Sequence, residues 1–213
     1  ISYRASPGNI GSVQRGARDF MNYCAGCHTL KYLRYERLAS DLNIPKNLLK
    51  KNLMFVAGQK TSSHVLNGMS AAEGKSFFAK APPDLTLEAG HRGAKWIYSY
   101  LHGFYLDPSR PTGVNNTLIP NVAMPDVMWS LQGWQKRVED EDGGYTLKSV
   151  TQGSMTPDQF DGFVRDISNF LAYAATPEHH TRMIVGPFVL LYLLILGVLC
   201  YLVKRAFWKD VHE

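Results

Sequence analysis

Two cysteines and a histidine stand close together near the beginning of the chain. Residues 24–28 read CAGCH, so Cys24 and Cys27 are three positions apart and His28 follows at once. This spacing is that of covalent haem attachment, in which the two thiols add to the haem vinyl groups and the histidine binds the iron. On a helix, the spacing places both sulfurs on one face with the histidine beside them. The motif therefore predicts one haem c held by Cys24, Cys27 and His28.

Two other chemistries also use closely spaced cysteines. A structural zinc site needs four ligands, and no second C-x-x-C or H-x-x-x-H segment completes one. A thioredoxin-like dithiol needs a strand–helix–strand context, which the residues around the motif do not indicate. The third cysteine, Cys200, lies in an apolar segment, so a disulfide framework is not expected.

The ligand opposite His28 decides what such a haem does. A methionine there raises the reduction potential and closes the iron to substrates, which gives an electron carrier, whereas an open position suits peroxide or gas chemistry. Of the seven methionines, Met21 lies on the motif helix and Met183 at an apolar segment. Met124 is the best placed of the others, beside a proline in a long irregular stretch, and Met128 is the fallback. The remaining candidates are Met54, Met69 and Met155.

Three amphipathic helices are expected to position these residues. Ser12 is expected to cap the first helix, whose apolar stripe ends at the motif. Residues 93–104 give a second apolar stripe. Thr156 begins a capping box with Pro157 at the first helical position, which starts a third helix that ends near 176–177. The stripe of the first helix consists of Val13, Ala17, Phe20, Met21 and Cys24.

The connections between these helices are long. Residues 107–126 are rich in proline and glycine, and a loop of this length in a compact domain usually has a function. The Asp142-Gly143-Gly144 segment predicts a hairpin turn between two short strands within residues 133–151.

An uncharged apolar segment follows the third helix. Residues 183–203 carry no charge, and a helix of this length, at roughly 1.5 Å per residue, crosses the hydrocarbon core of about 30 Å. We expect this helix to begin at Thr176-Pro177-Glu178, to be kinked by Pro187 and to be followed by Lys204 and Arg205. By the positive-inside rule, these cations place the C-terminus inside and the CAGCH motif outside, where covalent haem is assembled.

The charge pattern argues against nucleic-acid binding. The formal net charge is +5, but the basic residues are scattered and residues 139–142 form an acidic run. This run is interpreted as a solvated loop, or alternatively as a docking patch for a basic redox partner. The chain opens without the basic and apolar regions of a signal peptide, so we expect the printed sequence to be the mature form of an exported protein.

Further segments, in order along the chain, resemble the cytochrome c1 family. A tyrosine-rich segment at 32–38 follows CAGCH, and residues 81–85 read APPDL. PTGV follows at 111–114, PEH at 177–179 precedes the apolar segment, and Lys204, Arg205 and Trp208 come after it. A lone C-x-x-C-H is generic to c-type cytochromes, but this ordered series with a C-terminal anchor is specific.

The resemblance implies a fold and a set of site residues. It implies an all-α class I cytochrome c domain with long loops and at most a small β-hairpin, on one C-terminal transmembrane helix. The expected divisions are the haem domain at 1–176, the anchor at 177–205 and the inner tail at 206–213. Met124 is implied as the distal iron ligand, and Arg92 as a partner of a haem propionate, with a surface arginine as the alternative. Pro82, Pro83, Tyr32 and Tyr35 are implied to line the haem, although plain core packing explains the tyrosines equally well.

The resemblance also implies a place in a respiratory complex. The chain is expected to be a redox subunit of quinol–cytochrome c oxidoreductase without an independent catalytic site. It takes an electron from the Rieske iron–sulfur protein and passes it to a soluble or membrane-bound cytochrome c. Cytochrome b, membrane lipid and a dimeric complex are the other expected partners.

The expected location is the bacterial cytoplasmic membrane with the haem domain in the periplasm, or alternatively the mitochondrial inner membrane with that domain facing the intermembrane space. Two other functions stay open at this point. One is a membrane-anchored cytochrome that serves an oxidase or a dehydrogenase. The other is a haem enzyme or gas sensor with a vacant sixth position.

Overall fold

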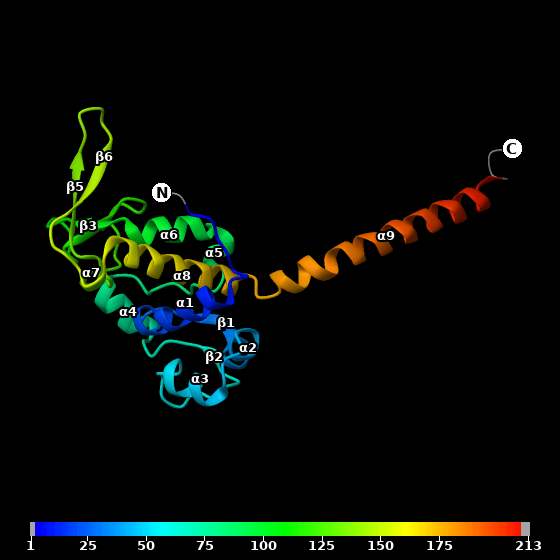
Figure 1. Ribbon diagram of the computed structural model, residues 1–213, viewed down its shortest axis with the longest axis horizontal. Helices are drawn as coiled ribbons and strands as arrows, with labels where there is room; N and C mark the ends of the chain where they lie inside the picture. Colours follow the sequence, from blue (N-terminus) through cyan, green and yellow to red (C-terminus); the bar gives the residue numbers. More distant parts are fainter. Residues whose placement is uncertain (1–2, 210–213) are drawn as a thin grey trace. The chain divides into compact units, whose positions relative to one another are not determined.

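The computed structural model describes residues 3–209, apart from the side chain of residue 180. The chain divides into two compact units, Ile1–Thr176 and Pro177–Glu213, and each is described by itself. Residues 210–213 of the expected inner tail lie outside the described part. The elements, labelled in Figure 1, are α1 Ile10–Tyr23, β1 Leu30–Arg34, α2 Tyr35–Asp41, α3 Lys46–Asn52, β2 His64–Val65, α4 Ala71–Phe78, α5 Glu88–His91, α6 Ala94–His102, β3 Phe104–Leu106, β4 Val114–Asn116, α7 Trp129–Gln132, β5 Gln135–Glu139, β6 Tyr145–Ser149, α8 Pro157–Ala175 and α9 His179–Phe207.

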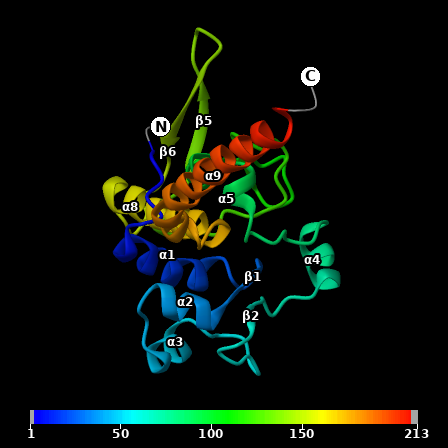
Figure 2. The ribbon, with the colours of Figure 1, turned by 90° about the vertical axis from the view of Figure 1, so that its right-hand side faces the viewer.

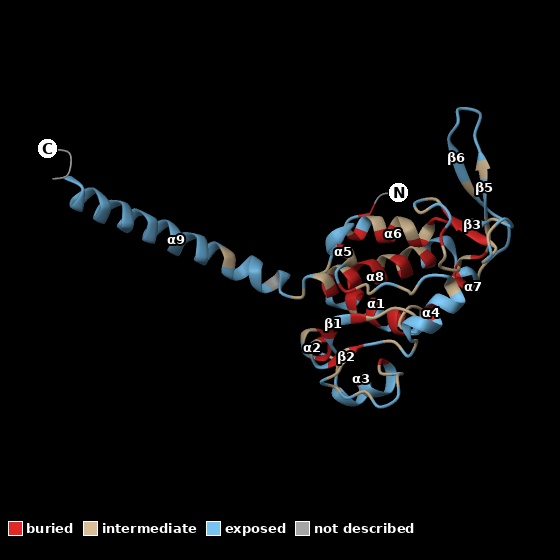
Figure 3. Cartoon of the chain, turned by 180° about the vertical axis from the view of Figure 1, so that it is seen from behind, coloured by how far each residue is buried: buried red, intermediate tan, exposed pale blue. Residues whose placement is uncertain are grey.

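Helices α1 and α8 form the centre of the first unit. They lie side by side in two perpendicular views (Figure 1, Figure 2), and their inner faces are buried (Figure 3). The rings of Phe20 and Phe170 meet at 5.4 Å between centroids. Gly16 permits this close approach, because a Cβ atom at that position would lie 2.7 Å from the Cβ of Phe170 and closer still to the main chain of Asp166. Since α1 leads directly into the CAGCH segment, this packing gives the motif a rigid base.

The beginning of α1 differs from the expectation. Asn9, rather than Ser12, is the N-cap, and its side chain accepts a hydrogen bond from the Ser12 amide. The Ser12 hydroxyl instead donates to Asp166 at 2.6 Å across the contact with α8. The prediction that Ser12 caps the helix was therefore wrong, because Asn9 already satisfies the free amide and leaves Ser12 one turn inside.

The capping box of α8 is confirmed. Thr156 accepts from the Gln159 amide, the Gln159 side chain accepts from the Thr156 amide, and Pro157 is the first helical residue. The helix ends at Ala175, as the sequence predicts. Its buried face includes Phe160, Phe163, Val164, Ile167, Phe170, Leu171 and Ala174.

The second predicted helix, at 93–104, is shorter than expected. Helix α6 ends at His102, and Phe104 begins β3, which pairs antiparallel with β4. Phe104, Val114 and Val122 form a small separate apolar cluster, against which Tyr100 and Met124 pack. The long loop therefore carries an apolar cluster of its own.

The all-α prediction is only partly correct. Six short strands form three two-stranded antiparallel sheets in the described residues. One of them is the predicted hairpin, in which β5 and β6 pair across the turn at 142–144 and extend away from the helices (Figure 1). The other strands are two to five residues long, too short for an alternating pattern to reveal them.

Helix α9 forms the second unit. Residues Thr181–Phe207 are long and apolar enough to cross a membrane, and none of the most apolar stretch is buried against the protein. The helix begins at His179 with Glu178 as N-cap, so the prediction that Thr176 caps it was wrong. Thr176 is instead the C-cap of α8, and its hydroxyl donates to the Ala172 carbonyl at 3.2 Å. Pro187 lies inside the helix, and its kink stays a prediction.

Candidate haem site

The CAGCH segment is a tight turn that continues from α1. Cys24 is the C-cap of the helix, and its amide donates to the Phe20 carbonyl at 2.8 Å. The amides of Cys27 and His28 then both donate to the Cys24 carbonyl, at 3.1 and 2.8 Å. Because the Phe20 ring is fully buried between α1 and α8, the turn starts from a fixed point of the core.

The orientation of His28 is set by a main-chain oxygen. Its Nδ1 lies 2.8 Å from the carbonyl oxygen of Pro83. A carbonyl only accepts hydrogen bonds, so Nδ1 carries the proton and donates it. The other ring nitrogen, Nε2, is then left with its lone pair free, which is the form in which histidine binds a metal. Burial lowers the pKa of His28, which favours the neutral ring.

Asp84 holds the segment that contains the Pro83 carbonyl in place through hydrogen bonds. Its carboxylate accepts from the Thr29 hydroxyl at 2.6 Å, the Lys31 amide at 2.7 Å and the Thr86 amide at 3.1 Å. Burial alone raises the pKa of Asp84, but these hydrogen bonds outweigh burial and hold the pKa below its usual value. The residue after Pro83 is thus tied to the residues that directly follow His28.

The two motif cysteines are not joined in a disulfide. Burial raises the pKa of Cys24 to about 12 and also raises that of Cys27. A redox-active dithiol requires a lowered thiol pKa, so these cysteines do not fit that chemistry. Within residues 3–209, no group of three or more His, Cys, Asp or Glu side chains is placed to hold a metal ion.

The thioether of Met124 is surrounded by apolar side chains and accepts one hydrogen bond. Its side chain packs against the cluster of Phe104, Val114 and Val122. Its Sδ lies 3.4 Å from the hydroxyl of Tyr100, which donates to it. The structure thus joins Met124 to α6.

The other candidate methionines lie differently. Met128 is 1% exposed inside the main core, which is the setting of a packing residue. Met54 and Met155 are partly buried and pack against the same core. Met69 is near Gly74, where its Sδ lies 3.6 Å from the position that a Cβ would take.

The remaining predicted residues fall into different environments. Arg92 pairs with Glu88 at 2.5 Å and lies over the Trp96 ring at 4.4 Å. Tyr32 is 63% exposed, whereas Tyr35 is 2% exposed within the main core. The Pro82 ring lies where it would be 2.7 Å from a Cβ atom at Gly74 of α4, and the Pro83 carbonyl accepts the hydrogen bond of His28.

The donor atoms fit a covalently bound haem. Two unpaired thiols, three residues apart, precede an imidazole whose free nitrogen is fixed by its hydrogen bond to Pro83. A separate thioether on the long loop lies among apolar side chains. Thiols, imidazole and thioether are together the donor set of a c-type haem with histidine–methionine ligation.

Comparison with known proteins agrees with this chemistry. The model of the cytochrome C1 family matches residues 8–211. The chain belongs to the cytochrome c1 family. This family carries covalently bound haem c and serves in electron transport as part of the cytochrome b–c1 complex.

Curated relatives cover most of the chain. The cytochrome c1 of Allochromatium vinosum is 46% identical over 94% of this chain and 85% of its own length. A protein of Nitrosomonas europaea named ammonia monooxygenase gamma subunit is 38% identical over 94% of this chain and 84% of its own length. The mitochondrial cytochrome b-c1 complex catalytic subunit of Candida albicans is 27% identical over 94% of this chain and 72% of its own length.

Several residues around the site have contacts that the sequence did not predict. Residues 93–104 were predicted only as an apolar stripe, but Trp96 and Tyr100 within it join Arg92 to Met124. Their spacing of four residues was the available signal, because residues four apart share one face of a helix. Asn67, which donates to the Cys27 carbonyl, gave no signal in the sequence.

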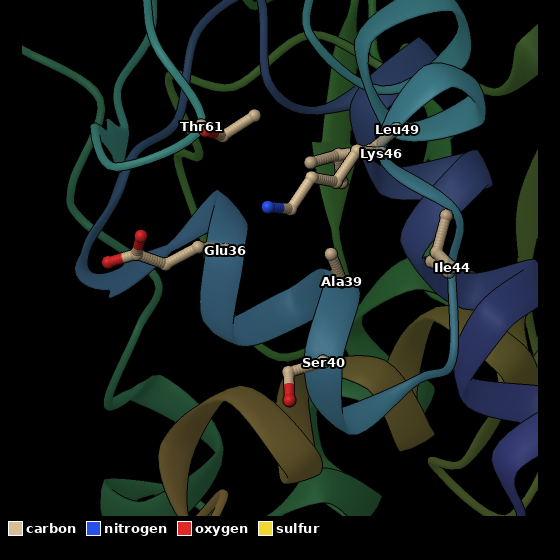
Figure 4. A pocket seen from close by; sticks show the side chains of 7 residues that line it. All are labelled: Glu36, Ala39, Ser40, Ile44, Lys46, Leu49 and Thr61. Atoms are coloured by element: carbon tan, nitrogen blue, oxygen red, sulfur yellow. The ribbon is translucent and has the colours of Figure 1, made fainter.

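A separate pocket of about 180 Å³ contains none of the predicted site residues (Figure 4). It lies between α2 and α3, and Figure 4 shows the Lys46 amine directed into the space between Glu36 and Thr61. Its lining residues are Glu36, Ala39, Ser40, Ile44, Lys46, Leu49 and Thr61.

Proposed function

We propose that this chain holds its haem through thioether bonds from Cys24 and Cys27, with His28 and Met124 as the two iron ligands. The observation that carries the proposal is the 2.8 Å hydrogen bond between His28 Nδ1 and the Pro83 carbonyl. It leaves Nε2 as the free donor and fixes the plane of the ring directly after the two cysteines. Arg92 is retained as a propionate partner, and Pro82, Pro83, Tyr32 and Tyr35 as residues of the haem wall.

We further propose that the chain takes an electron from a Rieske iron–sulfur protein and passes it to a soluble or membrane-bound cytochrome c. The bound haem supplies a one-electron iron couple, while the polypeptide supplies ligands, burial and docking surfaces. Cytochrome b is the other expected neighbour, within a dimeric complex. The likeness to cytochrome c1 of the b–c1 complex supports this assignment.

The proposed topology puts the first unit in the periplasm, or alternatively in the intermembrane space. Lys204 and Arg205 lie in the last turn of α9, where the positive-inside rule places the cytoplasmic or matrix end. Of the acidic residues at 139–142, Glu139 ends strand β5 and the other three lie at the tip of the hairpin, on the unit assigned to the outer side.

Purification of the native complex tests the assembly. We expect a redox spectrum of haem c, pigment that acid–acetone does not extract, and co-purification with a cytochrome b and a Rieske protein. Pigment that is extracted would contradict the covalent link. Co-purification with monooxygenase subunits instead would contradict the electron path.

A matched pair of substitutions tests the ligand. Met124→Leu is expected to abolish the weak far-red absorption band that marks sulfur on ferric haem iron, and to lower the potential, because methionine ligation raises it. Met128→Leu, a change of similar volume in the core, is expected to leave both unchanged. If the two results are exchanged, Met128 is the ligand.

A further inference from the structure

The hydroxyl of Tyr100 is directed at a sulfur atom. It lies 3.4 Å from Met124 Sδ, a distance suited to an O–H···S hydrogen bond. A tyrosine hydroxyl carries its proton at neutral pH, so Tyr100 can donate this hydrogen bond. A thioether has no proton of its own, so Met124 can only accept.

The ring of Tyr100 is held on two sides. The ring of Trp96 stacks on it with centroids 5.1 Å apart and planes within 11°, and Phe104 meets it edge-on at 5.3 Å. Arg92 covers the Trp96 ring at 4.4 Å and is itself paired with Glu88. This series of contacts leaves the hydroxyl little freedom to turn away from the sulfur.

The loop that bears Met124 is fixed to the same region through strand β4. Asn116 of that strand donates to the Tyr100 carbonyl at 2.8 Å. The adjacent Asn115 accepts from the Asn121 amide at 2.9 Å, and Arg110 donates to the Asn121 side chain at 2.9 Å. Asn121 has a positive φ of 61°, a conformation that asparagine tolerates, at the turn before Met124.

We propose that Tyr100 is a positioning residue for Met124, whose hydrogen bond to the thioether sulfur weakens the donation of that sulfur to ferric iron. This inference rests on the proposed role of Met124 as the axial ligand. A thioether sulfur has two lone pairs, so Met124 could bind the iron through one while it accepts the hydrogen bond from Tyr100 through the other. Because the hydrogen bond withdraws electron density from the sulfur, the ferric state, which needs that density more, is destabilised relative to the ferrous state. The polypeptide thereby raises the reduction potential through its outer contacts.

Tyr100→Phe in the intact complex tests the proposal, because it keeps the ring and removes only the hydroxyl. We expect the potential to fall, and exogenous imidazole to displace the methionine from ferric iron less readily. Loss of this one hydrogen bond is expected to raise the apparent dissociation constant of imidazole roughly two- to tenfold in the variant. A residue that merely supports the loop gives the opposite sign, since a loosened methionine is displaced more easily. Tyr105→Phe, on the adjacent strand β3, is the matched control and is expected to change neither quantity.

The outcomes separate this inference from the proposed function. If Met124→Leu leaves the far-red band in place, the ligand assignment is wrong whatever Tyr100 does. If Met124→Leu removes the band but Tyr100→Phe behaves like Tyr105→Phe, only the role of Tyr100 is overturned. Easier displacement by imidazole in Tyr100→Phe also overturns it.

A second substitution covers the case in which Tyr100→Phe does not assemble. Site-specific 3-fluorotyrosine at position 100 keeps the fold and makes the hydroxyl a stronger donor. The potential is then expected to rise, and an unchanged or lower potential contradicts the proposal.

Discussion

The ring of His28 is oriented by a main-chain oxygen, which no side-chain substitution removes. Its position therefore depends on the path of the chain at Pro82–Asp84 rather than on a single partner side chain. The Met124 sulfur, in contrast, accepts a hydrogen bond from a side chain, the hydroxyl of Tyr100, which one substitution can remove. The two proposed ligands thus differ in how directly mutation can alter their surroundings.

At this scale the thioether links give the first prediction. Cys27→Ala is expected to leave the haem attached through Cys24 alone, because each thiol forms its bond with a separate vinyl group. One vinyl group then stays conjugated with the ring, so the main absorption band of the reduced protein moves to longer wavelength. Mass spectrometry and an alkaline pyridine spectrum measure the two effects.

The third cysteine is the natural control for this experiment. Cys200 lies within α9, so Cys200→Ala is expected to leave both the mass of bound haem and the band position unchanged. A normal spectrum from Cys27→Ala would show that Cys27 carries no thioether.

Two helices in close contact set the frame for the motif, and glycines on them allow a matched test. Gly16→Ala forces a methyl group against the main chain of α8 and is expected to destabilise the protein by about 1–3 kcal/mol. Gly162→Ala, within α8 itself, meets no atom within 4 Å and is expected to stabilise the protein by about 0.5–1 kcal/mol, since alanine favours the helix. Urea unfolding of the detergent-solubilised protein measures both, and equal effects would contradict this account of the helix contact.

Asp84 links the residues after the motif to the segment that orients His28. Asp84→Asn is expected to cost about 1–2 kcal/mol at neutral pH, because three donors lose a charged acceptor. The sign of the pH dependence follows from the lowered pKa. A carboxyl with a lower pKa when folded than when unfolded adds stability above its unfolded pKa, and this stability is lost as the pH falls through the folded pKa.

The difference in free energy of unfolding between the wild type and Asp84→Asn should therefore become smaller as the pH falls. Unfolding measured from neutral pH to below the usual pKa of aspartate, near 3.8, tests this. Asp142→Asn, at the exposed hairpin tip, is the control and is expected to show no such difference. A gap between the wild type and Asp84→Asn that stays constant with pH would contradict the proposed role of the charge.

At the scale of the whole molecule, local signals and tertiary contacts were not equally predictable. The capping box at Thr156 and the hairpin turn at 142–144 could be predicted because their determinants lie within a few residues. The caps assigned to Ser12 and Thr176 were wrong because each residue bonds elsewhere, one to Asp166 and the other to the preceding turn. Several residue types can cap a helix, so the sequence alone did not decide which one does.

The site shows the same division. The C-x-x-C-H spacing is local, so the motif could be found directly in the sequence. The contacts of His28 with Pro83 and of Tyr100 with Met124 join residues that are 55 and 24 positions apart. Such contacts depend on how helices and loops pack, which a pattern of residue types does not encode.

The division of the chain after Thr176 leads to the last prediction. Every buried apolar residue of the described part lies at or before Ala174, and α9 buries none of its most apolar stretch. A chain that ends at Thr176 therefore keeps its whole core. We expect it to be recovered in the aqueous fraction with an unchanged redox spectrum, because α9 contributes only the anchor.

Two substitutions in the full chain separate anchoring from folding. Leu194→Arg puts a charge near the middle of α9, where insertion is disfavoured by about 2.5–3.5 kcal/mol, and is expected to reduce the membrane-bound fraction while the spectrum stays normal. Leu194→Ala is the control and is expected to stay in the membrane. If the chain that ends at Thr176 loses its haem or its fold, α9 supports the haem domain as well as anchoring it.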